Sequence, residues 1–112
     1  MSESPLAQRK CVPCEGGATS LPLSAIQVML KDVKGWNLVE GTRIFKTVSC
    51  KDFLDAVNLI QRIAPIAEAE DHHPDLHLTN YKKLTIELST HAIGGLSEND
   101  FIVAAKIDQL LT

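Results

Sequence analysis

Aromatic and basic side chains are scarce in this 112-residue sequence, and both shortages narrow its possible functions. Aromatic residues make up 4% of the chain, with one tryptophan, one tyrosine and three phenylalanines, so few rings are available to stack on exposed bases. Lysine and arginine number 11 against 14 aspartates and glutamates, which gives a formal net charge of -3. Binding to nucleic acid depends on clustered positive charge, whereas the basic residues here are scattered. We therefore expect no direct nucleic-acid partner.

Long apolar runs are also missing. No run approaches the ~18 apolar residues that a membrane span requires, and the first ten residues, MSESPLAQRK, lack the apolar stretch of a secretory signal. The hydrophobic share of 45% and the mean hydropathy of +0.03 are typical of a soluble globular chain. The sequence thus predicts one compact domain, located in the cytoplasm and without membrane contact.

Cysteines are few and odd in number: Cys11, Cys14 and Cys50. In a chain without an export signal this disfavours a disulfide scaffold, so we expect reduced thiols. Cys11 and Cys14 have the CxxC spacing of half a zinc site, but no second CxxC supplies the remaining ligands. Residues 1–19 show no sustained periodicity, and we interpret them as an N-terminal arm that carries the CxxC, followed by a folded domain over residues 20–112.

Hydrophobic periodicity divides that domain into seven elements. Helices are expected at about 24–33, 51–70 and from 97 nearly to the C-terminus, and strands at 36–40, 43–48, 77–78 and 81–90. Pro65 lies inside the second helix, where it removes a backbone hydrogen bond and predicts a bend. The third helix shows one apolar side, and Ser97 with Asp100 forms a variant of the capping box at its start.

The element order α-β-β-α-β-β-α predicts an α+β fold. Hairpins pair antiparallel strands, and three helices with one apolar stripe each can pack on one face of a four-stranded antiparallel sheet. The other face of the sheet is then left to solvent or to a partner, and the edge strands can pair across a subunit interface. We therefore expect a homo-oligomer.

Histidines are concentrated in one stretch, EDHHPDLHLTNY, at residues 70–81. His72 and His73 directly follow the second helix, and His91 ends the last predicted strand, so the three side chains can converge on one cleft suited to a small ligand. Because imidazole titrates near neutral pH, such a cluster suits acid–base catalysis or metal ligation. A solvated polar loop is the third interpretation, and the residues alone leave all three open.

The arguments for a metal or a nucleophile are weaker. His73 and His77 are four residues apart, like two ligands on a helix, but Pro74 biases His73 away from helical angles and no HExxH motif is present. No cysteine or serine lies in a nucleophile motif. A metal site built from Cys11, Cys14 and histidines, across subunits, is an alternative, but we expect no metal.

Seven positions match one spacing as a set: Glu68-x3-His72-His73-Pro74-x6-Tyr81-x9-His91-x8-Asp100. This set resembles the signature of the pterin-4a-carbinolamine dehydratases. The segments DHHPDLHLTNY and LSTHAIGGLSENDF, and the earlier Gly35-Trp36, are also similar to that family. The resemblance extends over roughly residues 20–112.

The resemblance implies a specific reaction, the loss of water from 4a-hydroxytetrahydropterin to give quinonoid dihydropterin. This recycles the tetrahydrobiopterin used by aromatic amino acid hydroxylases, one of which would then supply the substrate, and it needs no metal or redox cofactor. The family's fold is a four-stranded antiparallel sheet with three helices on one face, assembled as dimers or tetramers. Animal relatives also act as dimerisation cofactors of a homeodomain transcription factor, so a non-catalytic binding module or transcriptional coactivator is the alternative function.

By the same resemblance the site residues can be named. The catalytic set is His72, His73 and His91, and the substrate-binding positions are Asp71, Ser89, Thr90 and Ala92, with Glu68 as an orienting carboxylate and Trp36 near the site. We expect His72 and His91 to transfer protons and His73 to position the substrate, without assigning acid and base. Trp36 also fits a core anchor. Tyr81 and Asp100 are expected to have structural roles, and His77 to lie on the surface.

Overall fold

A computed structural model describes residues 5–11 and 20–111 of the chain. Its helices are α1 (Leu23–Leu30), α2 (Phe53–Glu70) and α3 (Glu98–Leu111), its strands are β1 (Asn37–Val39), β2 (Arg43–Ser49), β3 (Asp75–Thr79) and β4 (Lys83–Leu88), and two short 3-10 helices are η1 (Pro5–Gln8) and η2 (His91–Ile93). The predicted order of three helices and four strands is confirmed. None of the helices within the described ranges is both long and apolar enough to cross a membrane.

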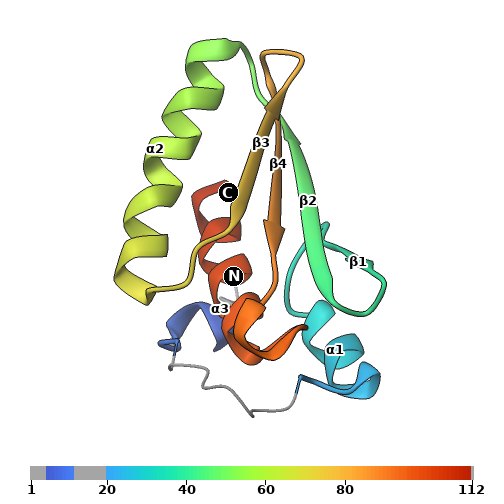
Figure 1. The fold of residues 1–112 in the computed structure, drawn as a ribbon. Coiled ribbons are helices and arrows are strands. Elements are labelled where there is room, and N and C mark those ends of the chain that lie inside the picture. The colour runs from blue at the N-terminus through green and yellow to red at the C-terminus, as the bar shows by residue number, and fades with distance from the viewer. Residues whose placement is uncertain (1–4, 12–19, 112) are drawn as a thin grey trace.

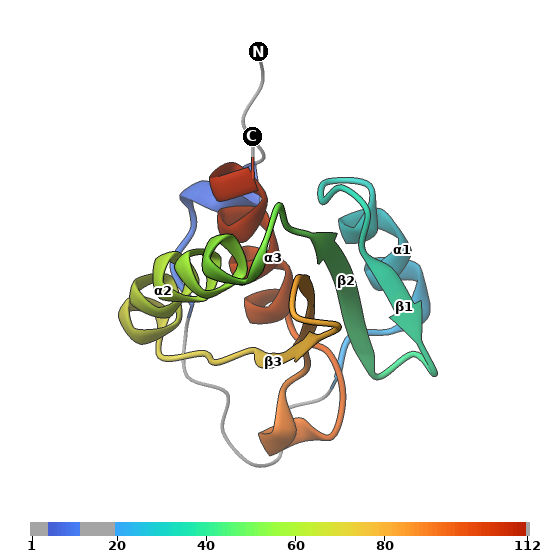
Figure 2. The same ribbon diagram turned by 90° about the horizontal axis from the view of Figure 1, so that it is seen from above.

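The four strands form one antiparallel sheet in the order β1-β2-β4-β3. The register pairs Ile44 of β2 with Leu88 of β4, so their side chains lie on the same face of the sheet, and both are buried. Because alternate residues of a strand point to the same face, Leu84 and Ile86 of β4 are buried on it too. All three helices cover this apolar face (Figures 1 and 2). The predicted α+β fold is therefore confirmed, with β4 in the interior of the sheet.

Strand ends differ from the prediction around β4. Asn80 and Tyr81 have positive φ angles of 49° and 51°, so they form the turn between β3 and β4, and Tyr81 does not begin a strand. At the other end, regular pairing stops at Leu88. Thr90 then makes an isolated antiparallel bridge with Gly95, and the four residues between them form a short loop that begins with His91.

Helix α2 begins and ends with recognisable caps. The Asp52 side chain accepts a hydrogen bond from the backbone N–H of Asp55 at 2.8 Å, which satisfies one of the free donors of the first turn. Pro65 does not interrupt the helix, and both Pro65 and Gln61, whose carbonyl loses its partner in the helix, are exposed residues. The helix thus continues unbroken to Glu70, and the turn that follows it lies at the end of the sheet.

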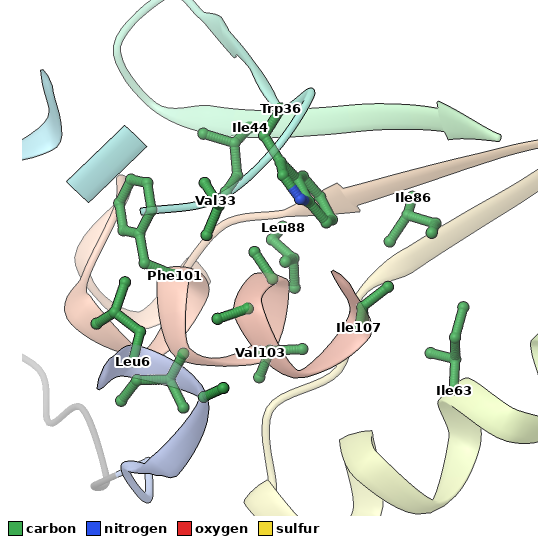
Figure 3. Packing of buried hydrophobic residues seen from close by; sticks show 14 of the residues in the cluster. Leu6, Val33, Trp36, Ile44, Ile63, Ile86, Leu88, Phe101, Val103 and Ile107 are labelled. Atoms are coloured by element: carbon green, nitrogen blue, oxygen red, sulfur yellow. The ribbon is translucent and has the colours of Figure 1, made fainter. Parts of the chain in front are cut away.

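Helix α3 forms the centre of the core. The sequence predicts one apolar side for it, but the structure buries residues on nearly all sides, among them Phe101, Val103 and Ile107 (Figure 3). The reason is η1, whose Leu6 is 3% exposed and packs with these residues on the side of α3 away from the sheet. The described part of the N-terminal arm is therefore part of the core, while Cys14 lies outside the described residues.

Candidate active site

One cleft of about 530 Å³ lies where the C-terminal end of α2 meets the loop after β4 and the first turn of α3. This volume is within the range of small-molecule sites, roughly 300–1,000 Å³. The lining residues come from four segments: Cys11; Ala69, Glu70, Asp71, His72 and His73; Ser89, Thr90, His91 and Ala92; and Asn99. The structure thus brings together the three predicted catalytic histidines and four of the predicted substrate-binding positions.

The end of α2 places the first two histidines. Asp71 adopts left-handed angles, φ 50° and ψ 42°, its N–H donates to the carbonyl of Glu68 at 3.3 Å, and the N–H of His72 donates to the carbonyl of Ala67 at 3.1 Å. These two bonds form a Schellman motif, which usually has glycine at the left-handed position. An aspartate there keeps a carboxylate at the rim of the cleft at some cost in backbone strain.

His72 is held by a buried carboxylate. Its Nε2 lies 2.6 Å from Oδ1 of Asp100, whose side chain has no exposed surface. The other carboxylate oxygen accepts the hydroxyl of Thr90 at 2.8 Å and the N–H of Ser97 at 3.0 Å. Three donors thus satisfy Asp100, as burial of a carboxylate requires. Donation of Nε2–H to Asp100 leaves Nδ1 of a neutral His72 as an acceptor.

Asp100 is the site residue that the sequence analysis missed, because its expected role was structural only. It does cap α3 through the Ser97 N–H, in the manner of a capping box, but the same carboxylate orients His72. The signal was present in the sequence, since Asp100 closes the matched set of residues. What the sequence lacked was the fold that joins two residues 28 positions apart.

His73 has a similar partner in a different environment. Its Nε2 lies 2.5 Å from Oε2 of Glu68, but the two side chains are 54% and 76% exposed. The orienting role predicted for Glu68 therefore concerns His73, and Glu68 itself does not line the cleft. Solvent screens such exposed pairs strongly, so this contact restrains His73 less than Asp100 restrains His72.

His91 lines the cleft from the loop after β4. The bridge between Thr90 and Gly95 closes this loop, with the Thr90 N–H donating to the Gly95 carbonyl at 2.8 Å. His91 is exposed, and no hydrogen bond or ion pair joins its ring to another residue of the described part of the chain. Its imidazole is therefore available to a ligand.

Two other predicted positions have side chains that are already engaged. Thr90 lines the cleft, but it is 5% exposed and its hydroxyl is hydrogen-bonded with Asp100 and Ser97. Trp36 does not line the cleft. Its ring is buried, and its indole N–H donates to Asp108 at 2.9 Å, which fits the alternative prediction of a core anchor.

The remaining candidates lie apart from the cleft. His77 is half exposed and lies 3.7 Å from Glu87, in keeping with a surface residue. Within residues 5–11 and 20–111, no three histidine, cysteine, aspartate or glutamate side chains are arranged to hold a metal ion. The CxxC metal hypothesis also needs Cys14, which is outside these residues. The chemistry that the cleft itself supports is proton transfer between imidazoles and a small ligand.

Comparison with known proteins gives a consistent family. The family model described as pterin 4 alpha carbinolamine dehydratase matches residues 19–110. A protein of Nitrosomonas eutropha, named as a candidate pterin-4-alpha-carbinolamine dehydratase, is 46% identical over 107 residues, which cover 95% of this chain and 93% of the relative. The mitochondrial pterin-4-alpha-carbinolamine dehydratase 2 of Arabidopsis thaliana is 43% identical over 94% of this chain and 58% of its own length.

A solved structure agrees with these relatives. The crystal structure of a transcriptional coactivator/pterin dehydratase from Brucella melitensis superimposes with a TM-score of 0.77 at 29% sequence identity, covering 84% of this chain and all of the other. The fold, the matched residues 19–110 and the identity to full-length relatives lead to one conclusion. The chain belongs to the pterin 4 alpha carbinolamine dehydratase family, a family of hydro-lyases.

Proposed function

We propose that this protein removes water from 4a-hydroxytetrahydropterin to give quinonoid dihydropterin, and so acts in the recycling of a pterin cofactor. The observation that carries the proposal is the presence of two unlike imidazoles in the lining of one cleft. His72 is anchored to a buried carboxylate at 2.6 Å, and His91 is open to a ligand. General acid–base catalysis needs two such groups, one to give a proton and one to take it.

The reaction requires two proton transfers. The bond between C4a and the hydroxyl oxygen breaks, the hydroxyl takes a proton and leaves as water, and the neighbouring ring N5 loses its proton as the quinonoid double bond forms. We assign the base to His72, because its Nδ1 is free when Nε2–H is donated to Asp100, and the carboxylate stabilises the imidazolium that results. We assign the acid to His91, whose ring can approach the leaving hydroxyl.

Substrate positioning falls to the remaining groups at the cleft. A pterin ring presents adjacent N–H donors on its pyrimidine edge, and the carboxylate of Asp71 at the rim can accept them. His73, restrained by Glu68, and the backbone of Ser89, Thr90 and Ala92 complete the contacts. All of these act without a metal or a redox cofactor, and an aromatic amino acid hydroxylase is the class of enzyme that would produce the substrate.

Turnover by single variants tests the proposal. Dehydration of enzymatically generated 4a-hydroxytetrahydropterin is followed by its ultraviolet absorbance, with the uncatalysed reaction as baseline. We expect His72→Ala and His91→Ala each to remove about 10²-fold or more of the acceleration, while His77→Ala, a matched surface histidine, leaves it intact. Wild-type protein that stays at the baseline would contradict the proposal and favour the non-catalytic binding module.

We also propose that the chain acts as a homodimer or homotetramer. The edge strand β3 leaves backbone groups unpaired on one side, and α2 exposes Phe53 and Leu54 by 55% and 67%, which a partner copy would cover. Sedimentation of the full chain across a concentration series tests this directly. A monomer at all concentrations would contradict it.

A further inference from the structure

A wall of the cleft is built by a residue that lies outside the matched family segment. Cys11 lines the cleft, although the family model begins at residue 19 and the sequence analysis assigned residues 1–19 to an arm. The chain reaches this position after η1, which lies beside α3 near the C-terminal end of α2 (Figures 1 and 2). The contacts that hold this segment therefore also set the shape of the cleft.

Three contacts fix the segment from Pro5 to Cys11. Leu6 and Ala7 are buried against α3, and Arg9 forms an ion pair with Glu98 at 2.9 Å. At the end next to the cleft, the backbone N–H of Cys11 donates to Oε1 of Glu70 at 2.8 Å. Both Cys11 and Glu70 line the cleft, so this last contact holds the segment at the cleft.

Glu70 is well placed for this role. Its side chain is 6% exposed and its other oxygen lies 3.5 Å from Nζ of Lys106 on α3. Burial would raise the pKa of Glu70, but the hydrogen bond from Cys11 and the charge of Lys106 together lower it below its usual value, so the carboxylate stays ionised. The hydrogen bond from the Cys11 N–H to this carboxylate is charge-assisted, and such bonds are stronger than hydrogen bonds between neutral groups.

The Cys11 side chain itself is kept as an uncharged thiol. Burial, followed by the nearby Glu70 carboxylate, raises the pKa of Cys11 to about 12, and the Sγ atom donates to the backbone carbonyl of Asn99 at 3.6 Å. An uncharged thiol is a poor nucleophile. It behaves instead as a small, polarizable apolar group. It is suited to pack against a flat ring.

We propose that Glu70 is a positioning residue that latches the N-terminal segment to α2 and α3, so that Cys11 forms one wall of the pterin site. Glu70 takes no part in proton transfer. The inference rests on the proposed function, because it assigns the cleft to a pterin. It extends the substrate site beyond the segment that carries the family signature, to a residue 59 positions before Glu70.

Substrate affinity provides the first test. Full-length Glu70→Ala should raise KM about tenfold and weaken the binding of a 7,8-dihydropterin, measured by fluorescence, by a similar factor, with kcat within about twofold of wild type. The matched control is Glu87→Ala, which removes a carboxylate of β4 that contacts the imidazole of His77 on β3 but does not line the cleft. It should change neither constant. Cys11→Trp, which places a bulky ring in the cleft, should also raise KM.

Alkylation of Cys11 provides a second readout that does not require turnover. In a Cys14→Ser, Cys50→Ser background the remaining thiol should react slowly with iodoacetamide at pH 8, more slowly still with the dihydropterin bound, and about tenfold or more faster after Glu70→Ala releases it. The latch would be overturned if wild-type protein binds the dihydropterin and the Glu70→Ala variant binds it equally well and reacts no faster with iodoacetamide. The proposed function would then still stand. Wild-type protein that neither turns over nor binds the dihydropterin would overturn both.

Discussion

His72 and His73 are neighbours in the chain, and each is paired with a carboxylate at nearly the same distance, 2.6 Å to Asp100 and 2.5 Å to Glu68. Their surroundings differ greatly. The side chains of the first pair are 12% and 0% exposed, and those of the second are 54% and 76% exposed. Because water and salt weaken exposed ion pairs, the same geometry holds one ring firmly and the other loosely. Burial of the partner, more than distance, therefore distinguishes His72, to which we assign proton transfer, from His73, to which we assign a substrate contact.

The largest expected effect comes from removing the charge of the buried partner. Asp100→Asn keeps the shape of the side chain but can present its amide N–H₂ toward His72, which would favour the wrong tautomer. We expect kcat to fall about 10²-fold or more and the free energy of unfolding to fall by about 1–3 kcal/mol, because a buried group loses a hydrogen-bond partner. Steady-state kinetics and urea unfolding measure the two effects. A variant with near wild-type kcat would show that Asp100 does not govern His72.

The turn that positions both histidines can be tested by a pair of variants. Asp71→Gly suits the left-handed angles, whereas Asp71→Ala does not, so only the alanine variant should lose stability, by about 1 kcal/mol. Both should raise KM for the pterin by about tenfold, because both lose the carboxylate. Thermal unfolding and kinetics, measured together, separate the backbone effect from the side-chain effect. Equal stability of the two variants would mean that the strain at Asp71 is negligible.

Glu70, the last residue of α2, adds a third carboxylate to the comparison of Asp100 with Glu68. Its contribution to stability can be measured as a function of pH. Because the pKa of Glu70 is lower in the folded protein than in the free side chain, its ionised form stabilises the fold at neutral pH. This stabilisation is lost as the pH falls through the folded-state pKa. The difference in unfolding free energy between wild type and Glu70→Gln should therefore be largest near pH 7 and shrink in acid. A difference that grows in acid would contradict the assigned direction.

The smallest effect is expected for the exposed pair. Glu68→Gln should change kcat and KM by no more than about threefold, since exposed pairs contribute roughly 0–1 kcal/mol. Raising the salt concentration to 1 M should reduce even that difference. The measurement is steady-state kinetics beside Asp100→Asn under the same conditions. If Glu68→Gln were as damaging as Asp100→Asn, burial would not be what distinguishes the two pairs.

Local patterns in the sequence were sufficient for most of the fold. Hydrophobic periodicity predicted the strand at 81–90 and the helix at 51–70, because each pattern is set by the backbone repeat of the element itself. The environment of α3 was not predictable in this way. Its second buried side depends on η1, a single short turn around Leu6, and one turn is too short to show a period.

The residues of the candidate site also differ in whether they could be predicted from local sequence. His72, His73 and Asp71 adjoin one another in the sequence, and the family resemblance indicated them together with His91. The contacts from Asp100 to His72 and from Cys11 to Glu70 span 28 and 59 residues, and only the folded chain brings them together. For Trp36 the sequence left two interpretations, a place near the site and a core anchor, and its buried ring, which donates to Asp108, fits the second.

The three bonds accepted by Asp100 have a consequence for how this protein can change. In many enzymes, substitutions that raise stability lower activity, because the catalytic groups lack stabilising partners in the fold without substrate. Here the carboxylate that orients His72 also caps α3 through Ser97 and ties down the end of β4 through Thr90. Selection for heat resistance alone would therefore preserve this part of the proposed active site, and a library screened only for folding should remain rich in variants that keep Asp100.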